Sequence, residues 1–217
     1  SLTGSAVPRR ARARAPELFY SPLVGREEEL SLLDGLLSRA MGKEGQLVLI
    51  SGEMGIGKSS LLRQFKLRAQ LSGARVVSIF SSDGDLVGGF YKQLGLVTPK
   101  LETGQPGLRK LATLNDLANK LLKYVKAVKG PVVFLLDDLD RADETSQEAL
   151  GFLSRSLRSQ PVLMIGSCQQ DGLSGKLIEG VKDEPFLTEI RLSGLSREET
   201  QALVLNLLNA KEKLEPI

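Results

Sequence analysis

The segment Gly52–Ser59 has the residue types and spacing that bind a chain of phosphates. It reads G-E-M-G-I-G-K-S, fits the pattern G-x-x-x-x-G-K-[S/T] and follows the apolar run 47–50. Glycines let backbone N–H groups approach a phosphate, and the N-terminus of a following helix adds partial positive charge. The alternative is an ordinary glycine turn, which is disfavoured because a predicted strand precedes the segment and a predicted helix follows it. We expect nucleotide contacts from Gly52, Glu53, Met54, Gly55, Ile56, Gly57, Lys58, Ser59 and Ser60.

Lys58 is expected to reach the β- and γ-phosphates and to act in catalysis, and the Ser59 hydroxyl to bind Mg²⁺. A second motif, the apolar strand Val132–Leu136, ends in Asp137 and Asp138. Asp137 is predicted to hold the hydration shell of the Mg²⁺, and Asp138 to orient or deprotonate the water that attacks the γ-phosphate. Two adjacent acids alone would favour a solvated turn, but the phosphate loop reverses that preference.

Composition excludes several other kinds of chemistry. The 217 residues are 41% hydrophobic and 25% charged, which suits one large α/β domain with a buried core. The chain has no histidine, so a Ser-His relay and a His-based zinc site are excluded, and the single cysteine, Cys168, has no internal disulfide partner. No apolar run approaches the roughly 20 residues of a membrane span, and no secretory segment is evident, so we expect a cytoplasmic protein without membrane contact.

The formal net charge of +3 comes largely from an arginine-rich segment near the N-terminus. We predict that residues 1–20 form a basic flexible linker. Weak contact with nucleic acid or with an acidic membrane surface is the alternative. It is disfavoured because no aromatic residue lies between the arginines for a base to stack on.

Apolar runs alternate with helical patterns, which predicts a parallel sheet with helices on both faces. Together with the phosphate loop, this indicates an α/β, three-layer P-loop NTPase sandwich, and from that fold class we expect a five-stranded parallel sheet in the order 5-1-4-3-2. Because the runs are continuous, we expect the strands to be buried on both faces. The predicted strands are Gln46–Ser51, Arg75–Phe80, Val132–Leu136, Val162–Ser167 and Thr188–Leu192.

Helical periodicity predicts two amphipathic helices that pack on this sheet. Between them, the glycine-rich region from Ser81 to Gly107 is predicted to be a loop with one short helix over Leu86–Leu94. Ser196 and Glu199 have the spacing of a capping box and predict a last helix that extends to Leu208. The two apolar stripes are Leu30, Leu33, Leu37 and Met41, and Leu114, Leu117, Leu121, Val125 and Val128.

Four blocks in order, LVGREEEL from Leu23, GEMGIGKSSLL, LLDDLDRAD and LSGLSREE, resemble the ATPase core of signal-transducing ATPases with numerous domains (STAND proteins). The likeness is greatest to the ATPase domains of large LuxR-type transcriptional regulators and of some adenylate cyclases and protein kinases. It implies ATP or ADP with Mg²⁺, an ATPase core over 21–193 and the start of a truncated helical lid over 194–217. It also implies covalently linked sensor and output domains outside this segment, through which nucleic acid would be bound, and a nucleotide-dependent oligomer.

The resemblance also implies roles for residues before the loop. The backbone at Leu23 and Val24 would border the adenine, and Arg26 would lie near the phosphates. From the residues alone, Arg26 pairs equally well with Glu29 on a solvated helix face.

After the fourth strand, similar proteins often carry an arginine that senses the γ-phosphate. Here Ser167 keeps a hydroxyl near the phosphates, but Gln169 is neutral. A guanidinium accelerates phosphoryl transfer strongly and an amide does not replace it, so we expect slow hydrolysis. The chain also departs from the family motif at Asp140 and Arg141. We expect Arg141 to pair with Asp140 or Asp143 at the surface; the alternative is that it supplies charge toward a neighbouring site.

These observations favour a regulatory ATP switch within a signal-transducing or transcription-regulating protein. The alternative is a turnover-driven AAA+ remodeller or loader that acts on nucleic acid or protein, which requires an arginine finger and ring assembly. A small-molecule kinase is a third hypothesis, but no acceptor-binding lid or basic clamp is evident.

Overall fold

A five-stranded parallel sheet forms the centre of the computed structural model, which describes residues 23–79, 84–99, 106–169 and 180–212. The strand order is β2-β3-β4-β1-β5, and every neighbouring pair is parallel. Read from the other edge, this is the predicted order 5-1-4-3-2, which is confirmed. The strands are β1 (Gln46–Ser51), β2 (Arg75–Ile79), β3 (Val132–Leu136), β4 (Val162–Cys168) and β5 (Leu187–Arg191).

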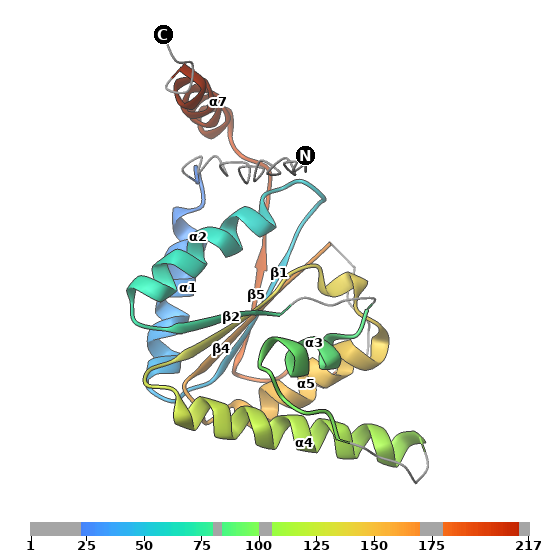
Figure 1. Cartoon of the computed structure of the whole chain (residues 1–217). Coiled ribbons are helices and arrows are strands. Elements are labelled where there is room, and N and C mark those ends of the chain that lie inside the picture. The colour runs from blue at the N-terminus through green and yellow to red at the C-terminus, as the bar shows by residue number, and fades with distance from the viewer. Residues whose placement is uncertain (1–22, 80–83, 100–105, 170–179, 213–217) are drawn as a thin grey trace, which may run out of the picture.

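Helices cover both faces of the sheet, so the predicted three layers are confirmed (Figure 1). Helices α1 (Glu27–Met41) and α2 (Lys58–Leu71) pack on one face in one hydrophobic cluster. The other face carries a second cluster, formed with α3 (Leu86–Gln93), α4 (Pro106–Ala127) and α5 (Glu144–Leu157).

Strand side chains divide between these two clusters because successive residues point to opposite faces. In β1, Val48 and Ile50 pack with α1 and α2, whereas Leu47 and Leu49 pack on the other side. The central strands β3 and β4 are buried along their whole length. The edge strands β2 and β5 are only partly buried, so the expectation of full burial was wrong for them.

Some predicted boundaries differ from the structure. Strand β4 extends one residue further, to Cys168, and β5 lies one residue earlier than expected. Met41, predicted to belong to the stripe that packs on the sheet, is the last residue of α1 and is 44% exposed. Phe80, predicted as the last residue of the second strand, lies outside the described residues.

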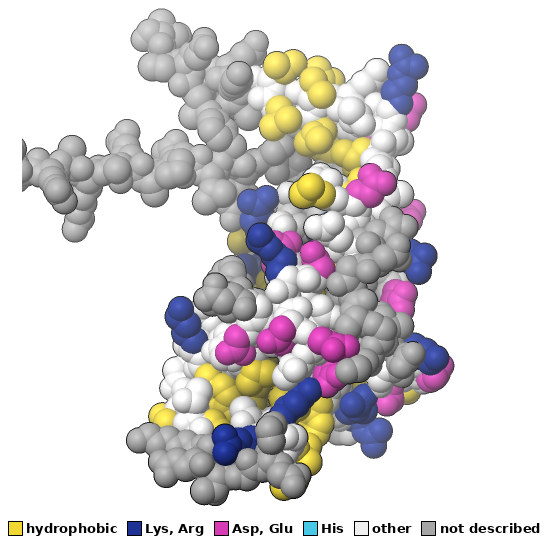
Figure 2. Space-filling model, turned by 90° about the vertical axis from the view of Figure 1, so that its right-hand side faces the viewer, with side chains coloured by type: hydrophobic (Ala, Val, Ile, Leu, Met, Phe, Trp, Pro, Cys, Tyr) yellow, Lys and Arg dark blue, Asp and Glu magenta, His cyan; other side chains and the backbone are white. Residues whose placement is uncertain are grey.

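The last described helix, α7 (Arg197–Glu212), extends beyond the carboxyl end of β5, away from the sheet (Figure 1). The predicted capping box is confirmed: the Ser196 N–H donates to Glu199 Oε2 at 2.6 Å, and the Glu199 N–H donates to Ser196 Oγ at 3.1 Å. Figure 2 shows hydrophobic side chains gathered over this helix at the top of the molecule. The exposed large ones are Val204, Leu205, Leu207 and Leu208. Among the described helices, none is long and apolar enough to cross a membrane.

Candidate nucleotide-binding site

The sheet brings the two predicted motifs together at its carboxyl edge. Strand β4 lies between β1 and β3, with Ile50 opposite Ser167 and Leu136 opposite Gly166. Because all three strands are parallel, the phosphate loop after β1 and the carboxylates after β3 emerge at the same edge. A ligand held by the loop therefore faces the carboxylates.

The phosphate loop is closed by its own lysine. Helix α2 begins at Lys58, whose Nζ donates to the carbonyl oxygens of Gly52 at 2.8 Å and of Glu53 at 2.9 Å. Gly55 and Gly57 have φ angles of +81° and +105°, which a side chain would strain. The first turn of α2 contains no acidic residue, so the partial positive charge of the helix N-terminus is available to an anion.

Ser167 links the two carboxylates that follow β3. Its Oγ donates to Asp137 Oδ1 and accepts from the Asp138 N–H at 3.1 Å. Asp138 has φ 56° and ψ 51°, and this left-handed turn begins the short 3₁₀ helix η1 (Leu139–Arg141). The structure therefore places Ser167, which is fully buried, beneath the carboxylates. There it holds the backbone N–H of Asp138 and one carboxylate oxygen of Asp137. Its expected contact with the phosphates stays a prediction.

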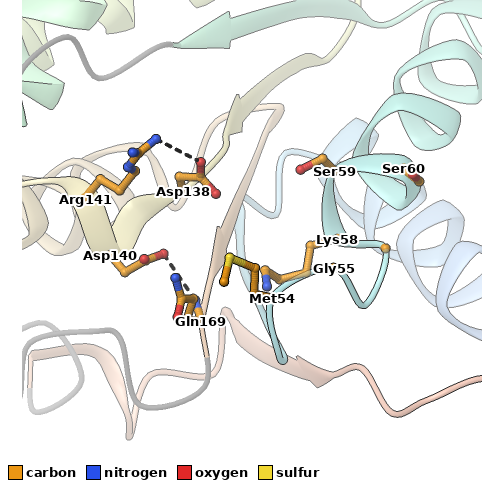
Figure 3. A pocket seen from close by; sticks show the side chains of 10 residues that line it. Met54, Gly55, Lys58, Ser59, Ser60, Asp138, Asp140, Arg141 and Gln169 are labelled. Atoms are coloured by element: carbon orange, nitrogen blue, oxygen red, sulfur yellow. Dashed lines mark hydrogen bonds and ion pairs between the residues drawn. The ribbon is translucent and has the colours of Figure 1, made fainter.

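A cavity of about 430 Å³ opens between the loop and η1, within the usual range for small-molecule sites. Figure 3 shows residues of the two motifs facing each other across it. Of the predicted contacts, Leu23, Val24, Arg26, Gly52, Glu53, Ile56, Asp137 and Ser167 are not among its lining residues. The lining residues are Met54, Gly55, Gly57, Lys58, Ser59, Ser60, Asp138, Asp140, Arg141 and Gln169.

On the η1 side of this cavity, Arg141 pairs with a different acid from those expected. Arg141 Nη1 lies 3.7 Å from Asp138 Oδ2, so the expected partners Asp140 and Asp143 were wrong. Asp140 accepts the backbone N–H of Gln169 at 3.2 Å, and Asp143 caps α5 by accepting the Ser146 N–H. Arg141 and Asp138 are 77% and 53% exposed, and an exposed pair contributes at most about 1 kcal/mol.

Arg26 joins the phosphate loop to the segment before α7. Its guanidinium donates to Glu29 Oε1 at 3.1 Å, which confirms that pairing, but the expectation of a solvated helix face was wrong because both side chains are largely buried. It also donates to the carbonyl oxygens of Ile56 at 3.3 Å and of Ser193 at 2.6 Å, and only 5% of the residue is exposed. The Ser193 contact could not be read from the sequence, because it spans 167 positions.

The residues just before α1 also contact α7. Gly25 has φ +70°, and a Cβ added there would lie 2.3 Å from Glu199 Oε1 in the first turn of α7. Leu23 is partly buried against the cluster under α1 and α2, and Val24 is half-buried. The predicted adenine contacts of Leu23 and Val24 are not tested by this arrangement.

Cys168 lies directly after Ser167 but takes no part in the cavity. The thiol is buried and donates to the Ile50 carbonyl oxygen at 3.7 Å. Burial raises its pKa to about 11, and the negative charge of Asp140 adds to this effect. The thiol is therefore protonated at neutral pH and does not supply a nucleophile.

Two side chains carry oxygen atoms suited to Mg²⁺. The exposed Ser59 lines it at the start of α2, and the partly buried Asp137 follows β3. The described residues include no cluster of three or more His, Cys, Asp or Glu side chains that could hold a metal ion. Mg²⁺ is usually bound by one or two protein oxygens together with substrate phosphates and waters, so Ser59 and Asp137 are the residues that would hold it.

Comparisons with solved structures show the same fold. Cdc6p from Pyrobaculum aerophilum aligns with a TM-score of 0.61 and 20% identity over 91% of this chain and 52% of its own. The Orc1 protein of Aeropyrum pernix, solved in complex with DNA, has a TM-score of 0.57 and 19% identity, again over 91% of this chain and 52% of its own. Hsp104 of S. cerevisiae, solved in complex with casein, has a TM-score of 0.57 and 21% identity over 88% of this chain and 30% of its own.

Sequence comparison identifies the family. An uncharacterized protein of Rhizobium meliloti (strain 1021) is 24% identical over an alignment of 225 positions, which covers 84% of this chain and 21% of the relative. The chain thus spans about a fifth of that relative and about half of the first two structures. The family described as AAA ATPase domain matches residues 22–165. The chain therefore belongs to the AAA ATPase domain family and is a nucleotide-binding ATPase module.

Proposed function

We propose that this module is a slowly hydrolysing ATP switch of the STAND type, part of a signal-transducing or transcription-regulating protein. The observation that carries the proposal is the neutral Gln169 on the cavity wall. Without a guanidinium at that position, hydrolysis lacks a strong source of transition-state stabilisation. Slow hydrolysis gives the triphosphate state a long lifetime, which suits a switch better than a motor.

Lys58, Ser59 and the backbone of the loop would hold the phosphates, and Asp137 with Ser59 would hold Mg²⁺. The metal would neutralise charge that develops on the phosphates. Asp138, whose carboxylate faces the cavity, would orient or deprotonate the attacking water.

Arg26 supports a mechanical link between the nucleotide and α7. It bonds one carbonyl in the phosphate loop and another just before α7, so a shift of the loop acts on the segment that leads into that helix. The exposed apolar side chains of α7 support its assignment, within 194–217, as the start of a lid that packs against further protein. Sensor and output domains, nucleotide-dependent oligomers and a cytoplasmic location belong to the same proposal.

Hydrolysis measured alone and with DNA tests the proposal. We expect ATP to bind with Mg²⁺ and to turn over slowly, without stimulation by DNA and without dependence on protein concentration. A spin label or fluorophore pair between α7 and α2 should report different distances with ADP and with a non-hydrolysable ATP analogue. Strongly stimulated, oligomer-dependent turnover would instead indicate a remodeller or loader.

A further inference from the structure

Arg141 has the position of a residue that responds to the third phosphate of a nucleotide. It comes from η1 and lines the cavity across from Lys58 and Ser59 (Figure 3). We propose that Arg141 exchanges Asp138 for the γ-phosphate, and that it thereby sets the preference of this site for a nucleoside triphosphate over a diphosphate. The proposal rests on the proposed function, since it requires nucleotide in this cavity.

Its present contact is weak enough to be exchanged. Arg141 is 77% exposed, and its 3.7 Å distance to Asp138 is longer than a hydrogen bond. Arg26, by contrast, is buried and donates to three acceptors, so it cannot leave its place without losing them. A phosphate group has two negative charges and several acceptor oxygens, and a guanidinium binds it in a bidentate manner. It is a better partner for Arg141 than one solvated carboxylate.

The distribution of charge supports this exchange. Among the described residues that line the cavity, the cations are Lys58 and Arg141. Lys58 is held to the loop by two carbonyl oxygens, and Gln169 on the opposite side is neutral. Arg141 is therefore the cation of this lining that comes from η1 and faces an incoming anion. Arg141 follows β3 and Gln169 follows β4, so we assign Arg141 to binding of the third phosphate and not to the transition-state role that a guanidinium at 169 would have.

The exchange also changes the state of Asp138. Its backbone N–H is fixed by the buried Ser167, so its carboxylate stays at the cavity when Arg141 leaves. The γ-phosphate would thus take the guanidinium away from the residue predicted to handle the attacking water. Binding of the triphosphate and preparation of the base become one event.

Equilibrium binding of ADP and of the β,γ-imido analogue of ATP to the 217-residue chain, with Mg²⁺, tests this proposal. In Arg141→Gln we expect the affinity for the imido analogue to fall about tenfold, while that for ADP stays within about twofold. Arg39→Gln is the matched control, because Arg39 is also exposed and pairs with an acid, Glu44, at 3.1 Å. That variant should bind both nucleotides as the unchanged chain does.

A second variant tests the exchange itself. Asp138→Asn removes the competing carboxylate, so we expect tighter binding of the imido analogue, by about threefold, and no gain when Arg141→Gln is also present. Unchanged binding of the imido analogue in Arg141→Gln, with ADP still bound, would overturn this proposal and leave the proposed function standing. Failure of the unchanged chain to bind ADP would overturn both.

Discussion

The two walls of the cavity are built in opposite ways. On the phosphate-loop wall, Lys58 is buried and bonds carbonyl oxygens of the same short segment. On the carboxylate wall, the groups come from β3, η1 and β4, and the pair between Asp138 and Arg141 is exposed and long. The first wall is a local structure that forms as a unit. The second depends on how three segments pack, so single substitutions can change its chemistry without disturbing the fold.

The largest effect should follow from breaking the loop wall. In Lys58→Ala, the affinity for both ATP and ADP should fall by about 100-fold or more, because a charge-assisted contact to the phosphates is lost. Isothermal titration calorimetry measures both affinities. The control is Lys126→Ala, an exposed lysine on α4 outside the cavity lining. Equal nucleotide binding in Lys58→Ala and in the control would contradict the assignment of the loop.

Asp137, which follows β3, should control binding of the metal rather than binding of ADP. Asp137→Asn keeps an oxygen that accepts from Ser167 but removes the negative charge. We expect the Mg²⁺ concentration needed for half-maximal ATP binding to rise by about tenfold to 100-fold. Metal-free ADP binding should stay unchanged. Asp183→Asn, an exposed acid outside the cavity lining, serves as the control. A Mg²⁺ requirement that does not move would exclude Asp137 as the residue that holds the metal.

Arg26 connects the loop wall to the rest of the molecule, so its removal should show as lost stability. We expect Arg26→Ala to lower the free energy of unfolding by about 2 kcal/mol, because two main-chain carbonyl oxygens lose a charged donor. Arg39→Ala, which breaks an exposed pair, should cost no more than about 0.5 kcal/mol. Urea denaturation measures both values. Similar losses in the two variants would mean that the buried contacts of Arg26 contribute little.

A gain of activity should result from adding charge to the carboxylate wall. Gln169→Arg should raise the rate constant of ATP hydrolysis by about tenfold, well below the effect of a fully positioned arginine finger. Gln169→Met is the control, since both variants keep the backbone N–H that Asp140 accepts. Equal rates in the arginine and methionine variants would show that the neutral side chain at 169 does not limit turnover.

The sequence predicted the elements that carry the loop wall, because the information for them is local. The positions of β1 and α2 follow from an apolar run, two glycines with positive φ and a lysine within a few residues. The strand order came with the P-loop fold class that the two motifs indicate, and not from the residues of the strands themselves.

The carboxylate wall was predicted less completely. The left-handed backbone at Asp138 and the 3₁₀ turn after it bring Arg141 back toward Asp138, whereas the expected partners Asp140 and Asp143 accept backbone N–H groups instead. Asp140 also lines the cavity, which its place two residues after Asp138 could have suggested. Which of several nearby acids pairs with an arginine depends on local backbone geometry, and residue spacing does not reveal that geometry.

The burial of Cys168 has a practical consequence for following α7. This thiol is the sole cysteine of the chain, and it lies protonated beneath the β1 backbone. A maleimide reagent at neutral pH should therefore leave the native protein unmodified and react at any cysteine engineered on an exposed position. The protein thus provides a ready background for attaching a single probe to the helix, without first removing a residue from its interior.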